Sequence, residues 1–465
     1  MPPIDRRDFL RNSFRYAGGA VIAPSLAGLV ASNGTGATSR VTTTGMLRRA
    51  RSGEGGYGEL SEYGDLPEIA TPTGFHALRI GRTGDLLSDG SILRNAFDGM
   101  GAFAHGARGV RLVRNHEMRD AAGAYAPLSA ANAYDAKANG GTTTVELTVR
   151  PDGGVELVRH FVSLSGTHVN CAGGPTPWGS WLSCEETVAG PAQGFDRNHG
   201  YVFEVPSSAD GPVVPVPLTA MGRFVHEAVA VDPNTGIVYE TEDRGRAGFY
   251  RFVPDVPGQL ARGGRLQMLA VRDAPNHDTR TGQTVGRRFA CTWVDIDEPD
   301  GEAPDLDPGF VFDQGHAKGG AVFARLEGAW WGDGSVYIAA TSGGDAGMGQ
   351  IFRYIPSPAG GDLMLVFESP SKDVLNMPDN VNVSPRGGIV LCEDGDGTNF
   401  VRGLTRDGAV FDLVRNNVND SEWAGACWAP QGRTLFVNLQ GATSESSAIW
   451  SATYAIWGPW ESGAL

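Results

Sequence analysis

The stretch that decides the fold is residues 226–271, HEAVAVDPNTGIVYETEDRGRAGFYRFVPDVPGQLARGGRLQMLAV. Four short runs, HEAVAV, IVYETE, FYRFVP and GRLQMLAV, combine β-branched, aromatic and alternating residues. Segments rich in Gly, Pro, Asn and Asp separate them. Such runs, bounded by turn residues, predict short antiparallel strands. The stretch therefore predicts one unit of four short strands.

The second run of this unit begins after a glycine, and glycine-led strands of the same kind recur along the chain. The six versions are GVRLVRNHE from 109, GSWLSCEE from 179, GIVYETED from 236, GSVYIAATSGGD from 334, GIVLCEDG from 388 and GRTLFVNLQG from 432. Each is followed by a second run rich in aromatic and β-branched residues. Four short strands repeated six times are typical of a β-propeller. We therefore predict an all-β, six-bladed β-propeller, with a pair of large β-sandwiches as the alternative.

The closure of the ring is also predictable. The last unit, residues 424–454, has no outer strand after IWSATY, whereas FHALRIG at 75–81 precedes the first unit and has an outer-strand pattern. We therefore expect residues 75–81 to pair with the last blade.

The N-terminus carries an export-like pattern, MPPIDRRDFLRNSFRYAGGAVIAPSLAGLVAS. Arg6-Arg7 followed by Phe9-Leu10 and a weakly apolar stretch is typical of a twin-arginine signal, and a disordered basic tail is the alternative. We predict a signal peptide at 1–34, an extension at 35–73 and a single propeller domain at 74–465. This organisation predicts a periplasmic or secreted monomer that meets the twin-arginine export machinery and has no stable membrane insertion.

Net charge and cysteine content restrict the partners. The formal charge of −15 argues against nucleic acid. It also means that a phosphate ester is bound well only where cations sit in the site. Five cysteines leave at least one thiol unpaired. Four of them lie on apolar strands, but Cys171 lies in a polar, glycine-rich segment, NCAGGP.

Acidic residues recur at equivalent positions of the repeat. Innermost segments line the central channel of a propeller, and the strands that follow them end at one end of the ring. The innermost segments supply Cys171, Glu227, Glu327, Asp379 and Asn380, and the next strands end in Asn115-His116-Glu117, Glu185-Glu186, Glu242-Asp243 and Glu393-Asp394. Carboxylates gathered on one axis repel unless they are protonated or bind cations. A single such pair is more often a solvated turn, and His116 or His226 alone is more often a core residue.

The types of side chain restrict the metal. Oxygen ligands of Asp, Glu and Asn suit calcium. A thiolate suits a softer or more highly charged ion such as iron or zinc. The sequence therefore predicts a mixed metal cluster at one end of the central channel.

Two basic residues are candidates for binding substrate. Arg325 shares a strand face with Glu327, and a guanidinium beside a cation cluster fits a phosphate clamp. An ordinary salt bridge is the alternative. Lys318 in HAKGGAVF is a further candidate, with a solvated loop as its alternative.

Several motifs together resemble one known family. NCAGGPTPWGSWLSCEE, GRFVHEA, VYETED, AVFARLEG, MPDNVNVSP and LCEDGDG occur between about 109 and 441 in the order of the PhoX family of alkaline phosphatases. The resemblance implies an iron (Fe3+) and calcium (Ca2+) cluster and hydrolysis of phosphate monoesters, with some diesters. It implies a thiolate ligand in Cys171, a substrate clamp in Arg325 and a phosphate or metal contact in Asn115. The further metal ligands that the sequence suggests are Glu117, Glu185, Glu186, Glu227, Glu327, Asp379, Asn380 and Glu393.

Two other functions remain open from the sequence. A six-bladed calcium-dependent lactonase or esterase also places Glu, Asn and Asp around an axial ion but needs neither Cys171 nor Arg325. A non-catalytic binding propeller would hydrolyse no ester.

Overall fold

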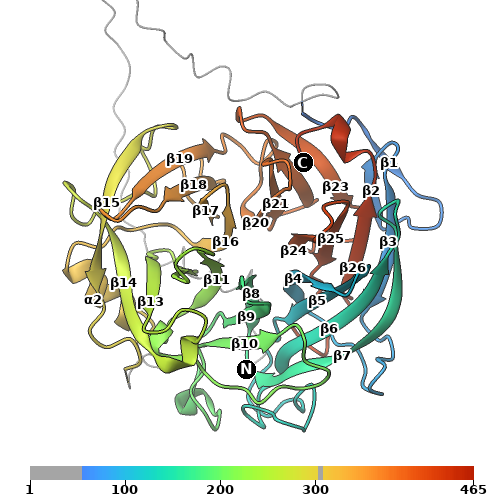
Figure 1. The fold of residues 1–465 in the computed structure, drawn as a ribbon, viewed down its shortest axis with the longest axis horizontal. Helices are drawn as coiled ribbons and strands as arrows, with labels where there is room; N and C mark the ends of the chain where they lie inside the picture. Colours follow the sequence, from blue (N-terminus) through green and yellow to red (C-terminus); the bar gives the residue numbers. More distant parts are fainter. Residues whose placement is uncertain (1–54, 302–306) are drawn as a thin grey trace, which may run out of the picture. The chain divides into compact units, whose positions relative to one another are not determined.

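Six blades of antiparallel strands surround a central axis, which confirms the predicted six-bladed β-propeller (Figure 1). The computed structural model describes residues 55–301 and 307–465. The predicted signal peptide at 1–34 lies outside these residues. None of the helices in the described parts of the chain has the length and apolar character needed to cross a membrane.

The first three blades follow one another along the chain. Blade 1 contains β4 (Phe97–His105), β5 (Gly109–His116), β6 (Gly140–Val149) and β7 (Val155–Thr167). Blade 2 contains β8 (Asn170–Pro175), β9 (Ser180–Glu185) and β10 (Val202–Pro206). Blade 3 contains β11 (His226–Val231), β12 (Val238–Glu242), β13 (Phe249–Pro254), β14 (Gly264–Val271) and β15 (Arg288–Asp295).

The remaining blades complete the ring. Blade 4 contains β16 (Leu326–Gly332), β17 (Ser335–Ala340), β18 (Gln350–Ile355) and β19 (Asp362–Glu368). Blade 5 contains β20 (Pro378–Val383), β21 (Ile389–Glu393), β22 (Phe400–Leu404) and β23 (Val410–Asn416), and blade 6 contains β24 (Trp423–Trp428), β25 (Thr434–Leu439) and β26 (Ala452–Trp457). Strand β15 also pairs with β19 and joins blades 3 and 4 into one sheet.

Short helices lie between some of these strands. The α-helix α2 covers Phe310–Ala317. The 3-10 helices are η3 (Pro191–Gln193), η4 (Thr219–Met221), η5 (Leu260–Arg262) and η6 (Trp460–Ser462).

Two N-terminal segments close the ring from outside. Strand β3 (His76–Arg82) pairs antiparallel with β26, from Ala452↔Arg82 to Trp457↔His76. The predicted closure of the last blade is thereby confirmed. Strands β1 (Leu60–Glu62) and β2 (Ile69–Pro72) extend blade 5 through β23. The propeller therefore begins before residue 74, because the second half of the predicted extension is part of a blade.

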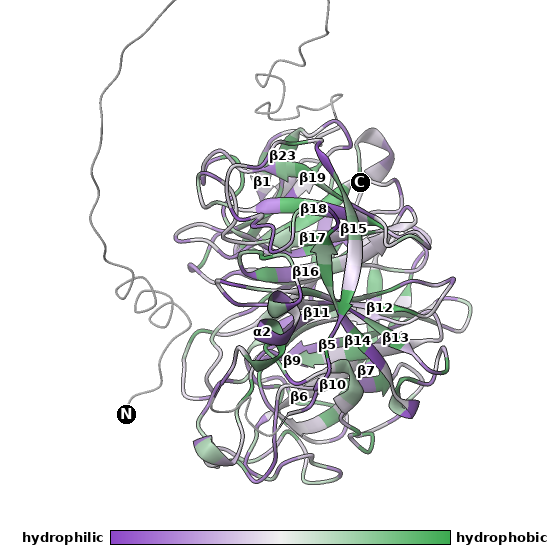
Figure 2. Ribbon diagram, turned by 90° about the vertical axis from the view of Figure 1, so that its left-hand side faces the viewer, coloured by the Kyte–Doolittle hydropathy of each residue, from purple (hydrophilic) through white to green (hydrophobic). Residues whose placement is uncertain are grey.

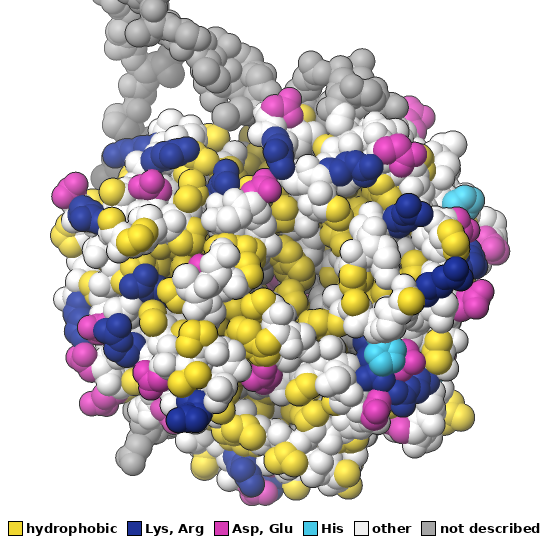
Figure 3. All heavy atoms as spheres, viewed as in Figure 1, with side chains coloured by type: hydrophobic (Ala, Val, Ile, Leu, Met, Phe, Trp, Pro, Cys, Tyr) yellow, Lys and Arg dark blue, Asp and Glu magenta, His cyan; other side chains and the backbone are white. Residues whose placement is uncertain are grey.

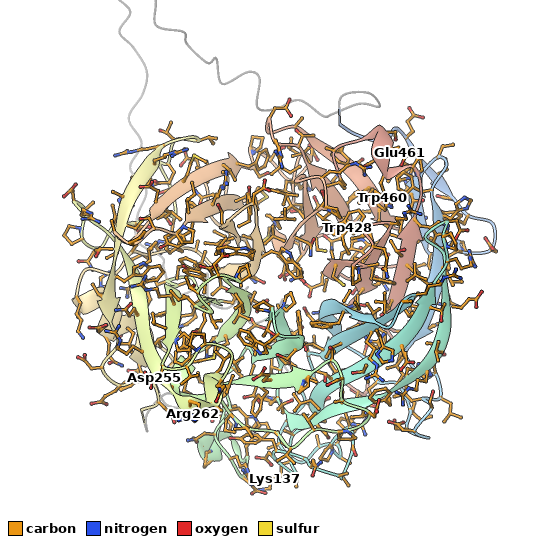
Figure 4. The ribbon with its side chains drawn as sticks, in the orientation of Figure 1. Lys137, Asp255, Arg262, Trp428, Trp460 and Glu461 are labelled. Atoms are coloured by element: carbon orange, nitrogen blue, oxygen red, sulfur yellow. The ribbon has the colours of Figure 1, made fainter. Side chains whose placement is uncertain are left out.

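The C-terminal segment is fixed under the same two blades. The hydroxyl of Tyr57 lies 3.1 Å from the backbone oxygen of Trp460 and 3.1 Å from that of Leu465, within hydrogen-bond distance of both. The ring of Trp460 packs edge-on against Trp428 at 4.6 Å between centroids (Figure 4). The two ends of the described chain therefore meet through buried contacts.

Hydrophobic layers fill the spaces between neighbouring blades. Each pair of adjacent blades shares a cluster of buried side chains, such as Leu182, Val229 and Phe252 between blades 2 and 3. Figure 2 shows hydrophobic and hydrophilic residues interspersed along the strands. The thiols of Cys184, Cys291, Cys392 and Cys427 lie in these layers, and none of the five cysteines forms a disulfide.

The closing strand gives a direct test of how the ring is held. Ile80 is 5% exposed and lies in the hydrophobic layer between blades 6 and 1. The substitution Ile80→Ala should therefore lower the free energy of unfolding by about 2–4 kcal/mol. The matched control is Leu78→Ala on the same strand, whose side chain is 41% exposed and should change stability by about 0.5 kcal/mol or less. Urea unfolding measures both. Equal effects, or a deletion of residues 70–85 that melts normally, would contradict closure by β3.

Candidate metal centre at the propeller axis

All six innermost strands carry a β-bulge at the same place. In each blade the innermost strand advances three residues while its partner advances two. A bulge re-aims the side chain at its position. The first bulged residues are Asp98, Cys171, Glu227, Glu327, Asp379 and Gly425. The fold thus places an acid or a thiol at this position in five blades and a glycine in the sixth.

Small residues after the bulges bring the innermost strands close together. A Cβ atom at Gly99 would lie 2.6 Å from the Cα of Ala172, and one at Gly328 would lie 2.6 Å from the backbone nitrogen of Val381. Below the bulges, apolar side chains including Met100, Trp330 and Val381 line the channel. On the face seen in Figure 3, hydrophobic side chains gather around the middle and most Lys and Arg lie nearer the rim.

The adjacent acid pairs at the ends of the second strands divide their roles. In Glu185, both carboxylate oxygens accept hydrogen bonds inside blade 2, from the His168 and Gly200 backbone at 2.8 Å each and from His199 Nδ1 at 2.7 Å. Glu393 accepts in the same way from the backbone of Asn376 and Phe400, at 2.9 Å each. The first member of each pair therefore fixes a loop. This placement does not fit the predicted metal-ligand role of Glu185 and Glu393.

In the pairs Glu185-Glu186 and Glu393-Asp394, the second member joins the axial acids. One ligand atom each of Cys171, Glu186 and Glu227 lies within 4.8 Å of the others. Glu186 and Asp394 lie one residue beyond the ends of β9 and β21, so they leave the strand pairing of the blade and reach the axial acids. The backbone N–H of Glu186 bonds to the Val169 oxygen at 2.8 Å, and that of Asp394 bonds to the Met377 oxygen at 3.0 Å. These bonds hold the second acid where the innermost strand begins.

Left-handed backbone marks this edge of the site. The residues just before four of the innermost strands have positive φ: Ala96 at 60°, Val169 at 52°, Arg325 at 46° and Met377 at 53°. This region is uncommon for residues other than glycine, above all for a β-branched valine. Such strain persists where the surroundings over-determine the conformation, as at ligand sites.

The possible ligand atoms form a continuous chain around the axis. Four groups of three atoms, each within 4.8 Å, share members from one to the next. The groups are Asp98–Glu117–Cys171, Cys171–Glu186–Glu227, Glu227–Glu327–Asp379 and Asp379–Asp394–Glu422. Eight carboxylates and one thiol are thereby gathered in one place. Repulsion among them is large unless protons or cations compensate the charge.

The centre of this chain fits a cation. Glu227 is buried, and its Oε2 atom has no hydrogen-bond partner among the described residues. Burial, followed by the charges of Glu186 and Asp379, raises its pKa well above the usual value. Cys171 Sγ donates to Glu227 Oε1 at 3.2 Å, and burial raises the pKa of this thiol as well. An ion bound here would replace protons on both groups.

Two arginines compensate part of the charge. Arg325 Nε lies 2.9 Å from Asp243 Oδ1, and its Nη2 pairs with Glu327. Arg119 Nε lies 2.7 Å from Glu117 Oε1, and its Nη2 pairs with Glu186. Arg325, the predicted phosphate clamp, therefore contacts the ring of acids at the axis, by which we mean the eight carboxylates and the thiol of the four groups. Arg119 contacts the same ring of acids from blade 1.

Asn115 is placed differently from its predicted contact with phosphate or metal. Its Nδ2 donates to the backbone oxygens of Cys171 and Ala172, at 2.8 and 2.7 Å. Its Oδ1 accepts from Trp181 Nε1 and Ser183 Oγ, at 3.0 and 2.9 Å. The amide's hydrogen-bonding capacity is used inside the protein. Asn115 therefore supports the bulge that carries Cys171.

Of the other two predicted site residues, Asn380 lies beside the acids at the axis, whereas Lys318 does not. Asn380 Nδ2 donates to Asp379 Oδ1 at 2.8 Å, and its Oδ1 accepts from the Gly425 backbone at 2.6 Å. Asn380 therefore links blades 5 and 6 beside the ring. Lys318 follows α2 on the perimeter of blade 3, where its Nζ lies 2.7 Å from Asp297 (Figure 1). That position does not fit the predicted role of Lys318 in substrate binding.

The predicted histidine roles agree with the structure. Burial lowers the pKa of His116 and of His226 to about 3 each. His116 bonds to the Asn95 backbone oxygen at 2.9 Å, and His226 to that of Gly222 at 3.0 Å. Both rings are neutral core groups.

Sequence reasoning missed several members of the ring, namely Asp98, Arg119 and Glu422. Asp98 lies in FDGM, which aligns with HEAV and LEGA at the bulge, and this alignment was the available signal. Glu422 directly precedes β24, the position that Arg325 holds before β16, but the residue type there differs from blade to blade and gives no signal. Arg119 lies in the loop after β5, outside the repeated strands.

A β-propeller whose axis carries clustered carboxylates and a thiol belongs with the metal-dependent propeller proteins. The family model "Alkaline phosphatase PhoX" matches residues 55–443, so this chain belongs to the PhoX family of alkaline phosphatases. The family makes it a phosphoric ester hydrolase, and it decides against the lactonase and the binding propeller.

One solved structure supports the fold, and two others are similar at lower scores. The chain matches Pseudomonas fluorescens PhoX in complex with vanadate, a transition-state analogue, at 18% identity and a TM-score of 0.66, covering 90% of this chain and 99% of that one. A gluconolactonase from Xanthomonas campestris matches at 12% identity, 82% and 100% coverage and a TM-score of 0.35. A luciferin-regenerating enzyme matches at 11% identity, 83% and 96% coverage and a TM-score of 0.40. A comparison with curated proteins gave no match.

The division within the acid pairs is testable. Glu186→Gln should weaken cation binding by about tenfold or more, because it removes a carboxylate from the ring. Glu185→Gln should instead lower the melting temperature and leave cation affinity within about twofold, because its carboxylate binds the loop. Calorimetric titration and thermal melting measure the two effects. The reverse outcome would show that Glu185, and not Glu186, is the cation ligand of the pair.

His199 makes stability depend on alkaline pH. Glu185 and Asp135 outweigh burial and raise its pKa from 6.5 to about 9. Because the folded-state pKa is raised, the contribution is complete below about pH 6.5 and is lost as pH rises through about 9. The shift corresponds to about 3 kcal/mol. The stability difference between wild type and His199→Gln, measured in chelator by urea unfolding, should shrink over this window, and a constant difference would contradict the assignment.

Proposed function

We propose that the chain hydrolyses phosphate monoesters, and some diesters, at a mixed iron and calcium cluster on the propeller axis. The observation that carries the proposal is the ring of eight carboxylates and one thiol, in which Glu227 keeps a buried oxygen without a protein partner. Arg119 and Arg325 compensate two of these charges at most. Bound cations can compensate the remaining negative charge, and unlike protons they also attract a phosphate.

The ligand types support two kinds of ion. Cys171, with Glu117, Glu186 and Glu227 around it, offers the thiolate and carboxylates that suit iron. Glu327, Asp379, Asp394 and Glu422 offer oxygen atoms alone, which suits calcium. When bound, such ions supply Lewis-acid activation of the phosphoryl group and of a water nucleophile.

The chain's own groups orient the substrate and the ligands. Arg325, 5% exposed at the ring, presents guanidinium N–H groups that bind phosphate oxygens and stabilise charge in the transition state. Asp243 orients Arg325 by accepting from its Nε and Nη2. Asn115 fixes the backbone of Cys171 and Ala172 from below. These contacts hold the site in shape before the substrate arrives.

We further propose a periplasmic or secreted location, with export by the twin-arginine pathway. The pattern Arg6-Arg7-Asp8-Phe9-Leu10 and the weakly apolar stretch after it support this proposal. Export of a fusion of residues 1–40 to a reporter that is active only outside the cytoplasm tests it, with Arg6→Lys/Arg7→Lys as control.

Loss of the thiol tests the proposed cluster. Cys171→Ser should lose its iron and lower the rate of p-nitrophenyl phosphate hydrolysis by about 100-fold, because a thiolate ligand is gone. The fold should be retained, as circular dichroism can show. The matched control is Cys184→Ser, since Cys184 is equally buried but lies in the hydrophobic layer between blades 2 and 3.

Chelation completes this test. Prolonged treatment with a chelator should abolish turnover, and readdition of iron with calcium should restore it. Full activity of Cys171→Ser without bound iron, confirmed by elemental analysis, would overturn the proposed cofactor while leaving membership of the family intact.

A further inference from the structure

Arg119 and Arg325 occupy the ring in similar ways. Each guanidinium bridges two acids from neighbouring blades: Arg119 bridges Glu117 and Glu186, and Arg325 bridges Asp243 and Glu327. A fork of fixed N–H groups suits such bridging. The two arginines differ in the acids that they cover and in their exposure.

Arg119 pairs with two of the acids that share a ligand group with the thiol. Glu117 belongs to the group with Asp98 and Cys171, and Glu186 to the group with Cys171 and Glu227. Glu117 Oε1 accepts from Arg119 at 2.7 Å, and its Oε2 accepts from Gln440. Both oxygens of Glu117 are therefore bound by the protein itself. A cation beside Cys171 that uses Glu117 or Glu186 as a ligand competes with Arg119 for their oxygens.

Arg119 is placed so that its guanidinium can leave the two acids and move into solvent. Its side chain is 24% exposed, whereas that of Arg325 is 6% exposed. The acids that it bridges are buried, at 0% and 4% exposure of their side chains. Arg119 therefore covers the acids from the solvent side, and its head group can move into water without losing hydration.

We propose that Arg119 is a built-in counter-cation, which holds the acids around Cys171 together until a metal ion displaces it. The inference rests on the proposed metal-dependent function. It gives Arg119 a positioning role that opposes loading: the guanidinium compensates the acid charge in the metal-free protein and competes with the incoming ion for the same oxygens. Removing Arg119 should therefore tighten metal binding while it destabilises the metal-free ring.

The test uses metal-free full-length protein and Co²⁺ as the probe, because bound thiolate gives Co²⁺ a strong near-ultraviolet absorption. Arg119→Gln should lower the dissociation constant for Co²⁺ by about tenfold or more, and should lower the melting temperature of the metal-free protein. Arg119→Lys keeps the charge but not the fork, so its affinity should lie between those of Arg119→Gln and wild type.

The matched control is Arg111→Gln. Arg111 also bridges two acids, Glu146 and Asp210, but none of the three belongs to the ligand groups at the axis. This variant should lose stability and keep the affinity of the wild type for Co²⁺. It separates the loss of an ion pair from the loss of a competitor.

Unchanged or weaker Co²⁺ binding by Arg119→Gln would overturn the proposal. An arginine that only stabilises the structure of the site would give this result, because its loss would not remove a competitor of the metal. If Arg119→Gln does not fold, Arg119→Lys decides: affinity equal to or weaker than wild type overturns the proposal. The proposed function fails separately, if wild-type protein neither develops the thiolate absorption nor hydrolyses p-nitrophenyl phosphate. Wild-type protein that does both, beside an Arg119→Gln variant of unchanged affinity, refutes the role of Arg119 alone.

Discussion

The mutual repulsion of buried carboxylates at the axis is the constraint on which the rest of the site depends. Eight carboxylates and a thiol lie in overlapping groups of atoms within 4.8 Å. At such distances, away from bulk water, like charges oppose folding by several kcal/mol for each pair. The burial-raised pKa values of Glu227 and Cys171 are one response of the metal-free chain, and the bridging arginines Arg119 and Arg325 are another. A bound cation can replace both the protons and the arginines. Because it also relieves the repulsion among the carboxylates, this repulsion favours metal binding.

The backbone, and not the side chains alone, imposes this crowding. The same bulge occurs in six innermost strands, so each blade delivers one residue to the same height on the axis. Left-handed residues such as Val169 and Met377 lie just before these strands and cost conformational energy. Loop-binding acids such as Glu185 and Glu393 fix the strand ends from the opposite side. The hydrophobic layers between blades offset the conformational cost of these backbone positions. A site built on strands that are packed in this way is held more rigidly than one built on loops.

The repeat made the fold predictable from the sequence, and the reasons for the partial success at the site are physical. Strand patterns and the glycine-led turns are local signals, so six blades and even the closing strand at 75–81 could be read directly. The acids in HEAV and LEGA, Glu227 and Glu327, were predicted on the innermost segments, but the bulge that directs them was not predicted. The sequence does not say which member of an acid pair faces the axis, because strand ends decide this and their position is uncertain by a residue or more. It also does not place Lys318 at the perimeter or Arg119 beside the axial acids, since Lys318 follows the helix α2 outside the strand repeat and Arg119 lies in the loop after β5.

The net charge of −15 and the attraction of a phosphate ester are reconciled by this arrangement. An acidic protein repels a phosphate at long range, but such repulsion is screened over about 10 Å at moderate salt. Inside that distance the local charge decides, and in the proposed cluster it is set by the bound ions together with Arg325. The acids that make the protein negative are thus the groups that turn its centre positive once cations are bound. The order of events follows from this inversion: a ring that lacks its cations repels the substrate, so metal loading has to precede phosphate binding.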